Sequence, residues 1–123
     1  MSAFALAADV TAPSFERPVD LVHLARQTLG DRALEREVLS LFEVQTRSII
    51  AQLHEIGDEK MRHDLAHTLK GSARAVGAWK VAEAAEACER ASADEAAQWQ
   101  EALADLAGRI ETALAAIEDF IRN

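Results

Sequence analysis

The residues with the clearest potential for chemistry in this sequence surround His67, in the stretch 64–77. Because an α-helix turns by about 100° per residue, a helix here would gather cationic and small residues on the face of His67. These residues are Lys60, His63, Lys70, Gly71 and Arg74. The opposite face would be apolar, and we expect it to be buried: Met61, Leu65, Leu69, Ser72 and Val76. His67 is therefore predicted to be exposed beside a basic stripe.

A neutral imidazole is a good nucleophile at neutral pH, so this face predicts group transfer to His67. Lys70 and Arg74 follow His67 by three and seven positions, and both side chains can reach a group attached to the ring. Such cations would stabilise a phosphoryl group through charge-assisted hydrogen bonds. Gly71 costs a helix roughly 1 kcal/mol relative to alanine, and close approach by another molecule is one reason to accept that cost. The alternative is a solvated basic face with a chance glycine.

The elements that must position this face are predicted to be helices throughout. Aspartates that can cap helix N-termini stand at Asp20, Asp31 and Asp58, and 92–95 fits a capping box. We expect a short helix from Leu21 to Leu29, then helices from Asp31 to Gly57, from Asp58 to Gly77, from about Ala78 to Ala91, and from Ser92 to the C-terminus. The predicted fold class is all-α, an antiparallel up-and-down four-helix bundle with a short extra N-terminal helix.

Apolar residues recur along each long helix at the spacing of three and four that predicts a buried face. In the second helix they are Leu34, Val38, Leu41, Phe42, Ile49, Leu53 and Ile56. In the fourth they are Val81, Ala84, Ala85 and Cys88, which are small enough to let a neighbouring backbone come close. In the last they are Trp99, Leu103, Leu106, Ile110, Leu114, Ile117 and Ile121.

Composition and charge narrow the class of protein. The chain has 123 residues, which favours one domain at 19–123 after an N-terminal arm at 1–18 that we expect to be mobile or draped. A formal net charge of -8 argues against nucleic acid or an anionic membrane as the main partner. One cysteine excludes an internal disulfide, and no stretch has the length of a membrane span. We expect a cytoplasmic protein in which Cys88 is a buried residue and not a nucleophile.

The run Ala66-His67-Thr68-Leu69-Lys70-Gly71-Ser72, followed by Val76-Gly77-Ala78, closely resembles the signature of histidine-containing phosphotransfer (HPt) domains. The motif is a histidine with lysine and glycine at the third and fourth positions after it and a second glycine ten positions on. The resemblance extends over most of residues 19–122. It also covers the helix after Asp20, the Leu41-Phe42 region and the Cys88-Glu89 pair. HPt domains relay phosphoryl groups in two-component phosphorelays.

The resemblance implies roles for individual residues. His67 matches the phosphorylated histidine, which reacts through its outer ring nitrogen. Lys70 matches the lysine that steadies the phosphoryl group, and Gly71 the small residue over which a partner docks. Glu89 matches a position whose side chain bonds the inner ring nitrogen and fixes the tautomer. The helical wheel, not the resemblance, adds Arg74, His63 and Lys60 as phosphate or partner contacts.

The resemblance also implies the partners. The chain would take a phosphoryl group from a receiver aspartyl-phosphate or a histidine kinase and pass it to a receiver aspartate. The required Mg²⁺ would be held by the receiver, with no cofactor or metal bound by this chain. The sequence has no glycine-rich phosphate loop, so we expect a phosphohistidine carrier without ATP-dependent kinase activity. The Ala-rich helices are compatible with a monomer or a homodimer.

Two other interpretations stay open. His63-Asp64-Leu65-Ala66-His67 places two histidines one turn apart, as in zinc sites of the H-E-x-x-H type. However, aspartate stands where those sites have glutamate, and no third-ligand motif follows. The second alternative keeps the fold and loses the chemistry, giving a non-catalytic interaction or adaptor bundle. The presence of both Lys70 and Gly71 argues against it.

Overall fold

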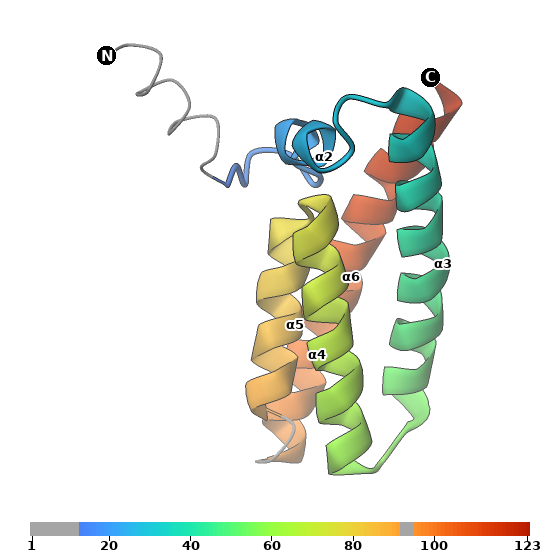
Figure 1. Cartoon of the computed structure of the whole chain (residues 1–123). Coiled ribbons are helices and arrows are strands. Elements are labelled where there is room, and N and C mark those ends of the chain that lie inside the picture. The colour runs from blue at the N-terminus through green and yellow to red at the C-terminus, as the bar shows by residue number, and fades with distance from the viewer. Residues whose placement is uncertain (1–12, 92–94) are drawn as a thin grey trace.

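The computed structural model describes residues 13–91 and 95–123, and these form five helices and no strand. The helices are α2 (Leu21–Gln27), α3 (Arg32–Glu55), α4 (Glu59–Val76), α5 (Trp79–Ala91) and α6 (Ala96–Arg122). The four long helices run side by side, and α2 lies across the end of the bundle where α4 meets α5 (Figure 1). Each long helix contacts the next in the chain, and α3 also contacts α6. The predicted all-α bundle with a short extra helix is confirmed.

The predicted capping residues set the helix boundaries. The carboxylates of Asp20, Asp31 and Asp58 each accept a hydrogen bond from the backbone N–H three residues later, which satisfies a free donor of the first turn. Gly77 ends α4 in the left-handed conformation, at φ 81°, which a glycine adopts without steric cost. Residues 92–94 of the capping box predicted at 92–95 lie outside the described part of the chain. Glu95 itself precedes α6 and makes no side-chain capping bond.

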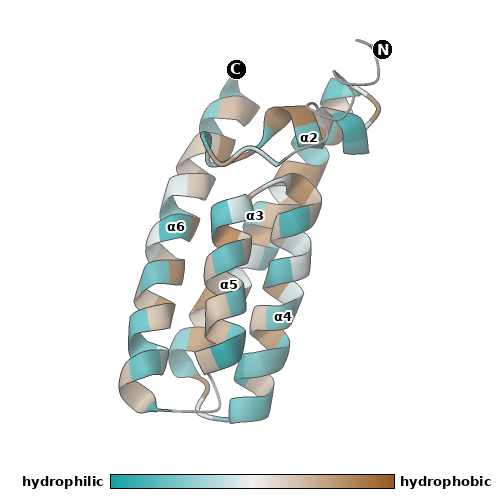
Figure 2. Cartoon of the chain, turned by 90° about the vertical axis from the view of Figure 1, so that its left-hand side faces the viewer, coloured by the Kyte–Doolittle hydropathy of each residue, from teal (hydrophilic) through white to brown (hydrophobic). Residues whose placement is uncertain are grey.

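The core lies between the four long helices, each of which has a hydrophobic and a hydrophilic side (Figure 2). The apolar residues predicted for the fourth helix are all buried, and so are those of the last helix except the partly buried Ile121. Alanines make up much of the buried surface of α5, and α4 and α5 form an extensive contact. Close packing of this pair is what brings side chains from both helices together at the surface.

The predicted buried face of α4 is partly wrong. Leu69 and Val76 are buried as expected, but Met61 is 49% exposed, and Ala66 and Ala73 are fully buried in its place. The buried face is thus rotated around the helix toward these two alanines, whose small side chains allow a neighbouring helix to approach closely. The prediction gave weight to large side chains, and it therefore chose the wrong edge of the stripe.

The predicted buried face of α3 is also partly wrong. Leu34 and Leu41 belong to the predicted apolar stripe but are 40% and 65% exposed, whereas Leu39 and Thr46 are fully buried. The core contact of α3 follows one line along the helix, and Leu41 lies beside it. Val44 is also exposed, at 69%.

Asp20 connects α2 to the rest of the bundle. Its backbone N–H donates to the Gly77 carbonyl at 2.9 Å, and its carboxylate accepts the indole N–H of Trp79 at 2.9 Å. The same carboxylate accepts the backbone N–H of Ser14 at 3.0 Å. A Cβ at Gly77 would lie 3.0 Å from Asp20 Cβ, so the contact requires glycine there. One buried aspartate therefore joins the segment before α2 to the turn between α4 and α5.

Asp20 should make folding stability dependent on acid. Burial alone would raise the pKa of Asp20, but hydrogen bonds from Trp79 and from the backbone of Ser14 and His23 outweigh it and lower the pKa below its ordinary value. The contribution is therefore fully present above the unfolded pKa of about 3.9 and is lost as pH falls through the lower folded value.

Asp20→Asn should lower the free energy of unfolding at pH 7 by about 1–3 kcal/mol, because a hydrogen-bonded buried charge is lost. The difference from wild type should shrink as pH falls below about 4. Urea unfolding at several pH values measures both, and Asp31→Asn, at an exposed cap, is the control. A difference that stays constant down to pH 2 would contradict the assignment.

Candidate functional site

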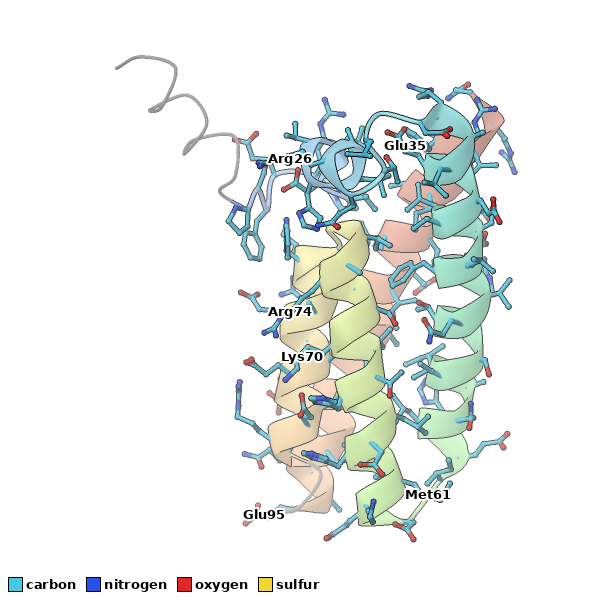
Figure 3. All side chains as sticks on the ribbon, viewed as in Figure 1. Arg26, Glu35, Met61, Lys70, Arg74 and Glu95 are labelled. Carbon is cyan, nitrogen blue, oxygen red and sulfur yellow. The ribbon has the colours of Figure 1, made fainter. Side chains whose placement is uncertain are left out.

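The candidate site is built on two neighbouring helices, α4 and α5. His67 stands near the middle of α4, between the buried residues Ala66 and Leu69. Glu89 stands near the end of α5 and approaches the same surface from the other helix. Figure 3 shows Lys70 and Arg74 on the part of α4 that borders α5, with Met61 far along the helix toward its start. The site thus depends on helix packing and not on a loop.

Glu89 holds the inner nitrogen of the His67 ring. Its Oε2 lies 2.9 Å from His67 Nδ1, and the Glu89 side chain is only 11% exposed. An ionised carboxylate only accepts hydrogen bonds, so Nδ1 must be the donor and must carry the ring hydrogen in the neutral imidazole. The lone pair then lies on Nε2, and the His67 side chain is 66% exposed. The geometry presents an unprotonated outer nitrogen to the solvent.

Lys70, three residues after His67 on α4, binds the same carboxylate. Its Nζ lies 2.6 Å from the other carboxylate oxygen of Glu89, and its side chain is 16% exposed. Burial would raise the pKa of Glu89, but hydrogen bonds from Lys70 and His67 outweigh this and lower the pKa. Glu89 is therefore ionised at neutral pH, as the tautomer of His67 requires.

His63 lies one turn before His67 and faces the same carboxylate. The two imidazole rings are nearly parallel, with 9° between their planes and 6.4 Å between their centroids. His63 Nε2 is 3.7 Å from Glu89 Oε2, and His63 Nδ1 is 3.4 Å from the backbone oxygen of Glu89. Three side chains of α4 therefore converge on one residue of α5.

The other predicted site residues lie around this cluster and do not join it. Arg74 pairs with Glu86 on α5 at 3.7 Å, and Lys60 pairs with Asp64 on its own helix at 2.9 Å. Gly71 has open space where a Cβ would project. The sequence prediction named Arg74 and Lys60 but did not predict their partners, Glu86 and Asp64. The Lys60–Asp64 pair has the spacing of four that stabilises helices, and this signal could have revealed it.

The structure also bears on Cys88 and on the predicted zinc alternative. Cys88 is buried, and burial together with the nearby Asp105 raises the pKa of its thiol to about 12, far from that of a reactive nucleophile. His63 and His67 share a face, but residues 13–91 and 95–123 contain no group of three or more histidine, cysteine or acidic side chains arranged to hold a metal ion.

One comparison with known protein families gives a match. The family model of the Hpt domain matches residues 37–120, about two thirds of the chain and all of the site. The chain belongs to the Hpt domain family. No curated protein and no solved structure matches it. The match begins inside α3, so α2 and its Asp20 anchor lie before the matched part of this Hpt domain.

Membership of the Hpt family places the chain in phosphoryl transfer within two-component phosphorelays, where Hpt domains interact with receiver or kinase partners. Among the described helices, none combines the length and the apolar character needed to cross a membrane. The resemblance found in the sequence, and the fold expected from it, are therefore confirmed for this Hpt domain.

Proposed function

We propose that this Hpt domain carries the phosphoryl group on His67 Nε2, accepting it from a receiver aspartyl-phosphate or a histidine kinase and passing it to a receiver aspartate. The observation that supports the proposal is the 2.9 Å contact between Glu89 Oε2 and His67 Nδ1. Because this contact keeps the ring hydrogen on Nδ1, the lone pair of Nε2 is available at the surface.

In the accepting step the Nε2 lone pair attacks phosphorus in line with the aspartyl oxygen. A nitrogen–phosphorus bond forms, the phosphorus–oxygen bond to the aspartyl group breaks, and the receiver carboxylate leaves with the bonding electrons. The Mg²⁺ that such a transfer uses would belong to the acidic pocket of the receiver. The His67 ring keeps its Nδ1 hydrogen and becomes cationic, and the ionised Glu89 beside it offsets that charge.

The surrounding residues receive roles from their positions. Lys70 holds Glu89 in place, and we propose that its ammonium also contacts the phosphoryl group. Gly71 leaves room for the receiver to approach His67. Arg74 and Lys60 form the rim of the docking surface, with Met61 adding apolar area, and their exposed ion pairs leave them able to exchange partners on docking.

The experiment that tests the proposal is transfer from a receiver labelled on its aspartate. With Mg²⁺, the label should move to this chain and be labile in acid and stable in base, as expected of a phosphohistidine. Trypsin releases peptide 63–70, which contains both histidines of α4, and cleavage before Asp64 separates His63 from His67. The label should remain with the His67 fragment. Label at another site, or none from any of a broad panel of receivers and kinases, would refute the proposal.

Glu89→Ala should slow phosphoryl acceptance by about 10- to 100-fold. The substitution removes a charge-assisted hydrogen bond of about 1.5–3 kcal/mol that favours the reactive tautomer and the cationic product. Single-turnover labelling from the same receiver measures the rate. Glu86→Ala is the matched control, since it removes a carboxylate one turn earlier on α5 that pairs with Arg74. Equal rates for the two variants would show that Glu89 does not orient His67.

A further inference from the structure

His63 faces the site without a place in the reaction described above. Its Nε2 is 3.7 Å from Glu89 Oε2, the same oxygen that accepts the bond from His67 Nδ1. The 3.7 Å distance from His63 is too long for a hydrogen bond, whereas the 2.9 Å distance from His67 Nδ1 is an ordinary hydrogen-bond length. In the observed arrangement Glu89 Oε2 is therefore hydrogen-bonded to His67 and not to His63.

The protonation state of His63 affects which of the two histidines bonds to Glu89 Oε2. In the neutral ring one nitrogen donates and the other accepts. A hydrogen on Nδ1 points toward the Glu89 backbone oxygen 3.4 Å away, and it leaves a lone pair on Nε2 facing the carboxylate. After protonation both nitrogens are donors, and Nε2–H becomes a charged donor directed at Oε2. The carboxylate then has two competing histidines.

The charged and titratable groups around His63 are few in the described residues. From α5 the facing group is Glu89, through its carboxylate and its backbone oxygen. From α4 itself they are His67, stacked on the ring, and Asp64, which feels the charge of both histidines. Asp64 is already paired with Lys60 at 2.9 Å. Glu89, whose other carboxylate oxygen is paired with Lys70 at 2.6 Å, is thus the carboxylate at short range from a protonated His63.

Protonated His63 would also oppose the product of the transfer. The His67 ring becomes cationic once Nε2 bonds phosphorus, and the parallel His63 ring lies 6.4 Å from it. Two like charges at this separation repel each other even near the surface. Loss of Glu89 from His67 and repulsion between the rings therefore act in the same direction.

We propose that His63 is a positioning residue that couples phosphoryl acceptance to pH: its neutral form leaves Glu89 Oε2 to His67, and its protonated form competes with His67 for that oxygen. The inference rests on the proposed function of His67 and adds a means of regulating it.

The test compares His63→Phe with wild type, using one labelled receiver at pH 7.5 and pH 6.0. Phenylalanine keeps a flat ring against His67 and has no nitrogen to titrate. A histidine side chain loses its neutral form as the pH is lowered into the mildly acidic range. The rate of His63→Phe divided by that of wild type should therefore rise by about twofold or more from pH 7.5 to pH 6.0. Effects of pH on the receiver cancel in this ratio. His54→Phe, at an exposed histidine in the last turn of α3, should give a constant ratio.

A second measurement does not depend on transfer. The ring ¹⁵N shifts of His67 report the Nδ1–H tautomer and should change less with mild acid in His63→Phe than in wild type. A constant rate ratio with identical shifts would overturn the inference, and so would a ratio that falls, because protonated His63 would then assist transfer. Absence of label in every variant, with the difference in shifts intact, would instead count against the proposed function of His67.

Discussion

His67→Gln is expected to reduce phosphoryl acceptance to background, a loss of at least about 10³-fold. The glutamine amide nitrogen has no free lone pair for attack on phosphorus, whereas the imidazole Nε2 has one. The His67 side chain is 66% exposed, so the substitution should leave the free energy of unfolding within about 0.5 kcal/mol of wild type. Label on the variant protein after incubation with a charged receiver measures the effect.

Two matched variants separate loss of the nucleophile from loss of any histidine. His63→Gln changes the neighbouring ring on α4, and His54→Gln changes an exposed histidine on α3. Both should still take up label at pH 7.5. If His67→Gln retained label while His63→Gln lost it, the phosphoacceptor would be His63.

Gly71→Phe is expected to slow transfer from a receiver by about 100-fold or more while the fold stays intact. Gly71 lies one turn after His67, and nothing occupies the space where its side chain would project. A ring at this place keeps the receiver aspartate out of line with Nε2, and a misplacement of about 1 Å costs on the order of 100-fold in rate. The thermal midpoint should not fall, because phenylalanine favours a helix more than glycine does.

Gly108→Phe is the control for this prediction. Gly108 is also an exposed glycine inside a long helix, with open space at its Cβ position, but it lies on α6. This variant should transfer at the wild-type rate. Gly71→Ala should fall between the two, with slightly higher stability and a small loss of rate. An unchanged rate in Gly71→Phe would show that the receiver does not pass over this surface.

Local signals predicted the helices well. Asp20, Asp31 and Asp58 began helices where expected, and Gly77 ended one, because capping depends on a few neighbouring residues. The buried faces were harder to predict. Ala66 and Ala73 displaced Met61 from the core since burial depends on how closely another helix packs, and small residues decide that distance. Leu41 was also predicted to be buried, but it lies beside the line of α3 that contacts the core and is 65% exposed.

In the functional site, too, features within one helix were predicted more easily than contacts between helices. Periodicity within one helix gathered His63, His67, Lys70 and Gly71, and in the structure the first three all contact Glu89. Glu89 lies on another helix, so its place came from resemblance to a family and not from any pattern in the chain. The ion pair between Arg74 and Glu86 spans the same two helices and was not predicted. Contacts between helices require the rotation of each helix, which the sequence alone does not supply.

The buried thiol of Cys88 has a practical consequence for studying this relay. A thiol whose pKa is raised to about 12 is almost entirely protonated at neutral pH, and its burial keeps alkylating reagents away from it. A cysteine introduced at the exposed Thr68 would therefore react with a maleimide fluorophore selectively, beside His67, with no need to remove the native cysteine. The emission of such a probe would report receiver association in the His67→Gln background. Affinity could then be determined separately from the rate of phosphoryl exchange.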